Sequence, residues 1–111
     1  MIVVAVDAPF DGRQLNRIAR RAIYGMRGVG ADFATGSGDY AIAFSTGEGL
    51  PPSDDDLSAL FLATMLGVEE ALINSVLRAT TAHGPEGRVA HAVPISVLED
   101  RLRQGGAVAL G

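Results

Sequence analysis

The sequence predicts an α+β fold in which short strands and longer helices pack in layers. Three patterns support this prediction. An apolar, β-branched run occupies residues 2–7, apolar residues recur at helical spacing over residues 12–27 and 53–80, and a short alternating run covers residues 40–46. Because 111 residues are enough for one core and too few for two, we expect a single domain over residues 1–111.

The opening of the chain predicts the first strand and the first helix. The run IVVAV is apolar on both faces, which is typical of a buried strand. We expect the next helix to follow Asp11 as its N-cap and to end at Gly28. Its predicted core-facing stripe consists of Leu15, Ile18, Ala19, Ala22, Ile23 and Met26. The outer face is expected to be solvated, with contact to an acidic partner or a substrate carboxylate as the alternative, and it carries Arg13, Arg17, Arg20 and Arg21.

The second half of the chain is predicted to be mainly helical. Ser53 and the three aspartates after it indicate the start of a long helix that continues to about Ala79. Its apolar side is predicted to contain Leu57, Leu60, Phe61, Met65, Val68, Leu72 and Val76. Residues 81–93 are expected to form a loop. A short helix should follow, with Pro94 in its first turn and Gly105 as its stop.

Composition limits the possible functions. Hydrophobic residues make up 48% of the chain and the mean hydropathy is +0.25, which favours a surface covered by another chain over an unusually well-filled core. The net charge of -4 argues against nucleic acid as a partner. Because the chain has no cysteine and no lysine, disulfides, thiolate chemistry, Schiff bases and a Walker-type phosphate loop are excluded.

We expect no membrane span, no cofactor and no metal. Glu69 and Glu70 interrupt the apolar stretch of the long helix before it reaches the ~20 residues that a span needs. His83 and His91 lie in the predicted loop and are expected to be solvated rather than metal ligands. No secretory signal precedes the first strand, so a cytoplasmic location is the default expectation.

The segment TGSGDYAIAFST places Ser37 and Asp39 in a glycine turn directly before the second strand. Judged from the residues alone, such a segment most often serves the turn itself, because glycine and aspartate suit tight backbone conformations. A Ser-His-Asp triad would also need a histidine close by, and both histidines lie far along the chain. The residues by themselves leave open whether this turn is catalytic.

Four segments in order resemble one family. IVVAVDAP, QLNRIARRAIYGMRGVG, GSGDYAIAFST and LFLATMLGVEEALINSVLRAT are similar to the L-aminopeptidase/D-esterase and β-peptidyl aminopeptidase family of N-terminal-nucleophile serine hydrolases. In this family a precursor cuts itself before a serine and yields a large α chain and a small β chain, and the sequence resembles that β chain. The resemblance implies a layered sheet–helix sandwich of the β-aminopeptidase/ornithine acetyltransferase type, one half of which a partner α chain completes.

The resemblance also implies a site. The family's nucleophile is the serine that begins the β chain, and this sequence has Met1 there. Ser37 and Asp39 match the serine and the acidic residue that flank the nucleophile. By resemblance, Ser37 would hydrogen-bond the terminal serine or its amine, and Asp39 would orient the network. The implied substrate is a small peptide or amide, the implied assembly is a larger αβ oligomer, and the chain as written is expected to be inactive.

Several alternatives stay open at this point. Met1 could reflect separate expression of the β portion with an initiator methionine, a replaced nucleophile, or a diverged subunit that has lost the reaction. The chain could also be a non-catalytic interaction domain that forms an oligomer. A further alternative is an acyltransferase subunit like the ornithine acetyltransferases, which use a similar fold with a terminal threonine nucleophile.

Overall fold

The computed structural model describes residues 1–36 and 38–105, and it has the mixture of helices and strands that an α+β fold requires. By its internal contacts the chain divides into two compact units, Met1–Leu72 and Ile73–Gly111. The expectation of one domain over the whole chain stays a prediction.

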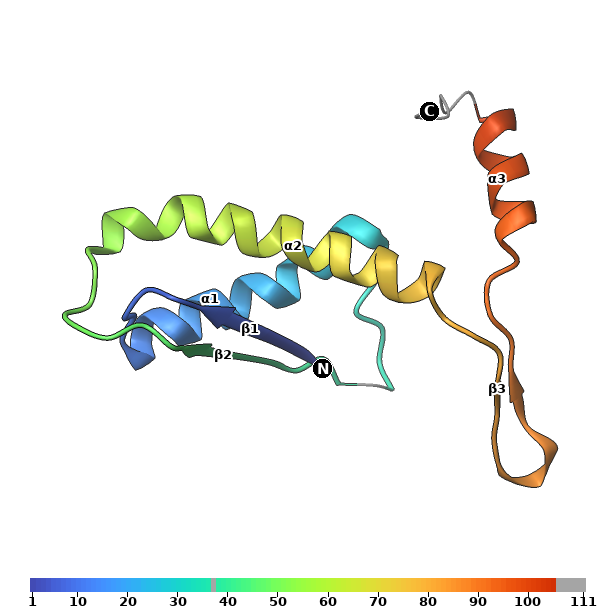
Figure 1. Ribbon diagram of the computed structural model, residues 1–111, viewed down its shortest axis with the longest axis horizontal. Coiled ribbons are helices and arrows are strands. Elements are labelled where there is room, and N and C mark those ends of the chain that lie inside the picture. Colours follow the sequence, from blue (N-terminus) through green and yellow to red (C-terminus); the bar gives the residue numbers. More distant parts are fainter. Residues whose placement is uncertain (37, 106–111) are drawn as a thin grey trace. The chain divides into compact units, whose positions relative to one another are not determined.

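The first unit is built on two parallel strands joined by a helix. Strand β1 (Ile2–Val6) pairs with β2 (Ala41–Ser45) in a register that sets Ile2 opposite Ala41 and Val6 opposite Ser45. Helix α1 (Gly12–Gly25) connects them and packs against the sheet (Figure 1). Both strands lie within the two stretches, 2–7 and 40–46, that the sequence predicts.

Helix α1 begins where the sequence predicts and ends differently. Asp11 is its N-cap, and a reciprocal pair of hydrogen bonds forms a capping box: Gln14 N donates to Asp11 Oδ1 at 2.7 Å, and Asp11 N donates to Gln14 Oε1 at 3.1 Å. The α-helix ends at Gly25 and continues as a 3-10 turn, η1 (Met26–Val29). The predicted stop at Gly28 is therefore wrong. Gly30 terminates the turn, with a φ of 92° that suits glycine.

The core of the first unit lies between α1 and α2 (Leu57–Leu77). Its buried apolar residues are Ile18, Ala22, Leu57 and Val68. The two helices approach closely at Gly25, where an added Cβ would lie 2.8 Å from the carbonyl oxygen of Met65. Ser53 caps the short 3-10 turn η2 (Asp54–Asp56) that leads into α2, because its Oγ accepts from Asp55 N at 3.2 Å.

The sheet is covered on one face only. Alternate residues of both strands turn toward the helices, whereas Val3, Ile42 and Phe44 on the other face are 56%, 54% and 44% exposed. The expectation that the first strand is buried is therefore wrong for this chain by itself. Within the described residues of the first unit nothing else packs against the second face, so an apolar surface remains open in this unit.

Helix α2 is apolar around most of its circumference. Leu62, Leu66, Ile73 and Val76 are each more than half exposed, so Val76 does not join the packed side that the sequence predicts for it. By length and composition alone, the helical stretch Asp54–Leu77 could cross a membrane, with a mean hydropathy of 1.5. A core helix of a soluble protein passes the same test. The expectation that the protein does not enter a membrane stays a prediction.

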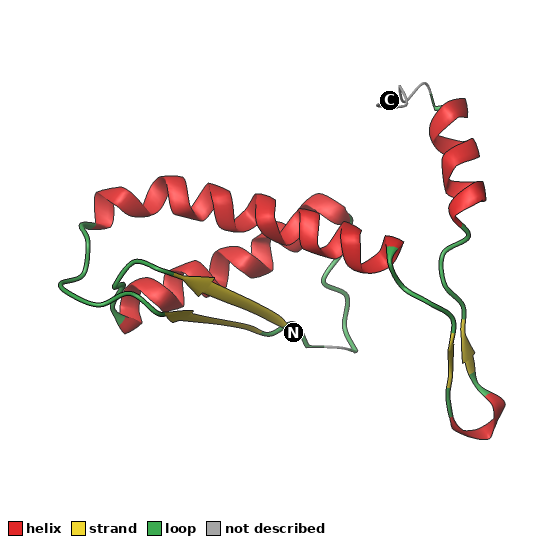
Figure 2. Cartoon of the chain, viewed as in Figure 1, coloured by secondary structure: helices red, strands yellow, loops and turns green. Residues whose placement is uncertain are grey.

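The second unit contains the end of α2, a small hairpin and a helix. The expected loop over 81–93 includes two short antiparallel strands, β3 (Ala82–His83) and β4 (Val89–Ala90), joined by the 3-10 turn η3 (Pro85–Gly87) (Figure 2). Here the loop prediction is wrong. The glycines of the segment Gly-Pro-Glu-Gly permit the tight reversal, and Gly84 N donates to Arg88 O at 2.8 Å to close it.

Helix α3 (Ile95–Gln104) ends the described part of the chain. Pro94 is its N-cap residue instead of lying in its first turn. Gly105 ends the helix as predicted, and its N–H donates to Arg101 O at 2.9 Å.

Candidate functional site

The parallel register brings the first residue of the chain to the turn that carries Asp39. Because Ile2 lies opposite Ala41, Met1 aligns with Tyr40, the residue that follows Asp39. Ile2 N donates to Tyr40 O at 2.8 Å and so extends the ladder to this point. Figure 1 shows the N-terminus beside the segment that enters β2. Ser37 lies outside the described residues, so its predicted role and that of Asp39 stay predictions.

Met1 and Asp39 are both accessible. The side chain of Met1 is 87% exposed, and Asp39 is also exposed. A residue at position 1 is therefore free to meet a partner or a substrate.

A cavity of about 250 Å³ lies next to Asp39. Its lining includes Met26 from η1 and residues 31–36 from the loop that follows. Phe33 in this loop has a φ of 54°, in the left-handed region that bulky residues rarely adopt. The cavity therefore combines two carboxylates, Asp32 and Asp39, with the apolar side chains of Met26 and Phe33 and a strained backbone. Sequence reasoning missed Phe33 because no local pattern marks its conformation.

The loop that forms this cavity is held by side-chain hydrogen bonds. Arg27 Nη1 donates to Ala31 O at 2.9 Å, and Asp32 Oδ1 accepts from Ala34 N at 3.1 Å. Ala31 N also donates to Met26 O at 3.2 Å. These bonds fix the backbone on both sides of Phe33.

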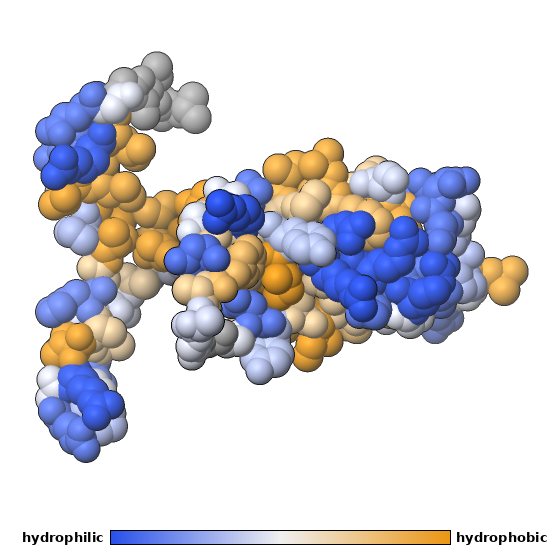
Figure 3. Space-filling view, turned by 180° about the vertical axis from the view of Figure 1, so that it is seen from behind, coloured by the Kyte–Doolittle hydropathy of each residue, from blue (hydrophilic) through white to orange (hydrophobic). Residues whose placement is uncertain are grey.

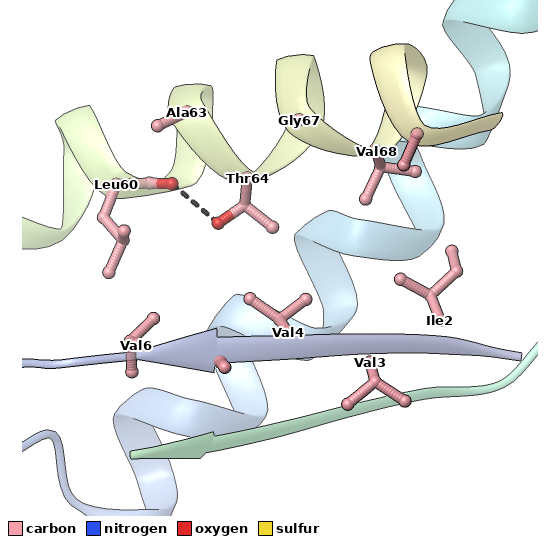
Figure 4. A pocket seen from close by; sticks show the side chains of 11 residues that line it. Ile2, Val3, Val4, Val6, Leu60, Ala63, Thr64, Gly67 and Val68 are labelled. Carbon is pink, nitrogen blue, oxygen red and sulfur yellow. Dashed lines mark hydrogen bonds between the residues drawn. The ribbon is translucent and has the colours of Figure 1, made fainter. Parts of the chain in front are cut away.

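A groove of about 350 Å³ separates β1 from α2 (Figure 4). Ile2, Val4 and Val6 point from the strand toward the helix, and Val3 points away. The helix side carries small side chains at successive turns, at Ala63, Gly67 and Ala71. The one hydroxyl in this lining, Thr64 Oγ1, donates to Leu60 O at 2.8 Å. With no titratable side chain in its lining, the groove has no groups for catalysis and offers space for an apolar element.

The arginine face of α1 is only partly solvated. Arg13 contacts both carboxylate oxygens of Asp54 at 2.7 and 2.8 Å, and Arg17 contacts one of them at 2.9 Å. The hydrogen bond from Arg13 and, as the next largest cause, the one from Gln14 hold the pKa of the Asp54 carboxyl well below its usual range. The hydrogen bond between Arg13 and Asp54 also raises the pKa of Arg13. This face forms the hydrophilic area that Figure 3 shows over the first unit from behind.

The remaining arginines of this face include one that stacks on aromatic rings. The guanidinium of Arg21 lies 4.4 Å from the ring centre of Phe61 and 5.6 Å from that of Tyr24, and Arg17 also lies over Phe61 at 5.2 Å. The two contacts with Phe61 join α1 to α2, whereas the contact with Tyr24 lies within α1. The prediction of a solvated arginine face is therefore wrong for Arg17 and for Arg21.

The two histidines do not gather with other ligand-type side chains. His83 belongs to strand β3 and His91 follows β4, and both are exposed. Within residues 1–36 and 38–105, no group of three or more His, Cys, Asp or Glu side chains could hold a metal ion.

Comparison with known proteins gives relatives over most of the chain. The chain is 32% identical over 107 residues to the β-peptidyl aminopeptidase BapA of Sphingosinicella xenopeptidilytica, covering 85% of this chain and 27% of that protein. The solved PH0078 protein of Pyrococcus horikoshii OT3 matches with a TM-score of 0.85 and 42% identity, covering 96% of this chain and 34% of that one. The chain thus spans about a third or less of the length of these relatives.

A further solved structure names the fold. The L-aminopeptidase D-Ala-esterase/amidase of Ochrobactrum anthropi, described as a prototype for the serine aminopeptidases and as a variant of the Ntn hydrolase fold, matches with a TM-score of 0.85 and 32% identity. It covers 97% of this chain, which covers 34% of that structure. A family model described as peptidase family S58 matches residues 1–90. The chain therefore belongs to peptidase family S58, as its resemblance to the L-aminopeptidase/D-esterases and β-peptidyl aminopeptidases predicts.

Proposed function

We propose that this chain is the β subunit of a serine aminopeptidase or amidase that releases N-terminal residues from small peptides or amides. One observation carries the proposal: the register of β1 and β2 aligns residue 1 with the residue that follows Asp39. In a member of peptidase family S58, this juxtaposition fits a nucleophile at the chain end with a carboxylate beside it. The reaction would pass through an acyl-enzyme.

The chemistry explains why position 1 decides activity. A serine with a free amine carries its own base, because an α-amine titrates at a pKa of about 7.7–8.0 and can accept the hydroxyl proton. Ser37 would hydrogen-bond this residue, and Asp39 would orient the ammonium. Met1 has no hydroxyl, so we propose that the chain as written does not catalyse the reaction.

The open surfaces support a second chain as partner. The apolar sheet face with Val3, Ile42 and Phe44 suits a second sheet, and the groove between β1 and α2 suits a further strand at the free edge of β1. We propose that an α chain supplies both, together with the oxyanion donors, and that αβ units form a larger oligomer in the cytoplasm. The relatives, about three times as long as this chain, contain enough residues for such an α chain.

The test restores the nucleophile. The Met1→Ser chain, with the serine as its free N-terminus and the α chain present, should hydrolyse an aminoacyl p-nitroanilide, and the Met1 complex should not. Asp39→Asn should lower the rate strongly, whereas Asp55→Asn, an exposed carboxylate in η2, is the matched control and should not. If the assembled Met1→Ser complex shows neither a burst nor turnover, the catalytic proposal is wrong.

The interaction-domain alternative rests on the same open apolar face. It predicts that the purified chain alone forms a discrete soluble oligomer in light scattering. An orphan subunit should instead aggregate or remain insoluble until the α chain is present. A terminal-threonine acyltransferase would be recognised by acyl transfer to an amine acceptor in place of hydrolysis.

A further inference from the structure

We infer that Phe33 is a specificity-determining residue, whose ring forms the wall against which the side chain of the substrate's N-terminal residue packs. The inference deepens the proposed function and rests on it. It starts from a backbone outlier: Phe33 has a φ of 54°, a conformation that is unfavourable for a bulky aromatic residue. Strained residues of this kind cluster at ligand-binding sites, where the surrounding structure holds them in place.

The loop holds Phe33 in this conformation from both sides. Asp32 Oδ1 accepts from Ala34 N across the residue, and Arg27 anchors the preceding carbonyl of Ala31. Side-chain hydrogen bonds therefore hold the backbone on either side of the strained residue. Asp32 and Arg27 are positioning residues for the ring.

Core packing does not account for the strain. The side chain of Phe33 is 46% exposed, so the first unit gains little burial from placing an aromatic ring there. The exposed ring instead lines the cavity of about 250 Å³ that also contains Asp39. The strained backbone thus delivers an apolar surface to the proposed catalytic carboxylate.

The lining selects a class of ligand. Met26 and Phe33 provide apolar surface in a lining that is otherwise largely polar, and the carboxylates of Asp32 and Asp39 both provide negative charge. An amino acid amide with an apolar side chain and a free ammonium group has the complementary features. The volume lies below that of sites for drug-sized ligands, as expected for a pocket that takes one residue.

Binding can be measured without turnover, because Met1 provides no nucleophile. In the complex of the Met1 chain with its α chain, L-leucinamide and L-alaninamide are titrated by calorimetry. We expect Phe33→Gly to lower the affinity for leucinamide about tenfold and to change the affinity for alaninamide less than twofold, because the loss of apolar contact affects the larger side chain more. The melting temperature should stay equal or rise, because glycine accepts the positive φ without strain.

Two further variants separate the ring from the backbone. Phe33→Ala removes the ring and keeps the unfavourable φ. It should therefore lower the affinity for leucinamide as much as Phe33→Gly does, without any gain in melting temperature. Glu86→Gly is the matched control, because Glu86 has a φ of 59° in the hairpin and lies outside the lining of this cavity. It should raise the melting temperature and leave both affinities unchanged.

Several results would overturn the inference. These are no binding of either amide, equal weakening of both amides by Phe33→Gly, no weakening of either, or a marked fall in melting temperature that indicates a core role. Failure of the proposed function looks different: the Met1→Ser complex would give no turnover while leucinamide still depends on Phe33. The two ideas therefore succeed or fail on separate measurements.

Discussion

Asp54 shows how one side chain connects two helices that are far apart in the sequence. It accepts hydrogen bonds from Arg13, Arg17 and Gln14 of α1 while it opens the turn that leads into α2. Because its folded pKa is lowered, its ionised form favours the folded state. The contribution is present above the unfolded pKa of about 3.9 and is lost as the pH falls through the lower folded value.

The Asp54→Asn variant should therefore be less stable than the wild-type chain at neutral pH. We expect the difference in urea midpoint to be constant from pH 7 down to about pH 4 and to shrink below that, because the wild-type carboxylate then becomes protonated. Asp55→Asn is the matched control, and its stability should follow the wild type. A difference between Asp54→Asn and wild type that is the same at pH 2 and pH 7 would contradict this account.

Prediction from sequence succeeds at residue scale where the interaction is local. The cap at Asp11 is confirmed, because it depends on the residues of one turn. Gln14 is buried and satisfied by Pro52 O at 2.9 Å and Asp54 Oδ1 at 3.0 Å, and it was not predicted. Partners 38 and 40 residues away leave no local pattern. The conformation of Phe33 could not be predicted either, because it depends on the whole loop and leaves no local sequence pattern.

At the scale of elements, the contact between α1 and α2 depends on Gly25. A Cβ at this position would lie 2.8 Å from Met65 O and 3.1 Å from the Cβ of Val68. We expect Gly25→Ala to lower the free energy of unfolding by about 1–2 kcal/mol, since the clash outweighs the better helix propensity of alanine. Urea unfolding followed by circular dichroism measures the change.

Gly67→Ala is the matched control for this contact, because Gly67 is also helical and nothing lies within 4 Å of its added Cβ. In the chain by itself it should raise the free energy of unfolding by about 0.5–1 kcal/mol. If both alanine variants change the free energy of unfolding in the same direction and by the same amount, helix propensity alone explains both changes. The proposed close contact between α1 and α2 at Gly25 would then be wrong.

The sequence predicts an element correctly where residues close together in the chain determine it. The apolar stripe of α1 is confirmed, and its residues are buried or half-buried. The stripe of α2 is confirmed from Leu57 to Leu72, where a neighbouring helix or strand faces it. The hairpin at 82–90 was missed because two-residue strands carry no alternating pattern, and only the turn residues mark it.

At the scale of the whole molecule, the composition predicts that an apolar surface is covered by another chain, and it does not identify that chain. An apolar fraction of 48% indicated a covered surface, and the structure places exposed apolar residues on one sheet face and around α2. The chain belongs to peptidase family S58 and spans about a third of its solved relatives, and the second chain is our proposal for what covers this surface. These residues encode neither the shape nor the polar groups of such a proposed partner, so oxyanion donors could not be predicted from them.

The open sheet face allows the proposed assembly to be tested with one side chain. Ile42 is 54% exposed and lies opposite Val3 in the register. Ile42→Asp should leave the fold of the chain unchanged, because the residue points away from its core, and should make the isolated chain more soluble. It should also abolish the complex with the α chain, since burying an uncompensated carboxylate between two sheets is strongly unfavourable.

Size-exclusion chromatography with light scattering of the co-expressed chains measures this. Asn16→Asp is the matched control, because it adds the same charge on the exposed side of α1 and should assemble as the wild type does. If Ile42→Asp still forms a complex of wild-type mass and stability, the second sheet does not cover this face. If instead the wild-type chain alone forms a discrete oligomer that Ile42→Asp dissociates, the same face joins copies of this chain, and the interaction-domain alternative replaces the two-chain enzyme.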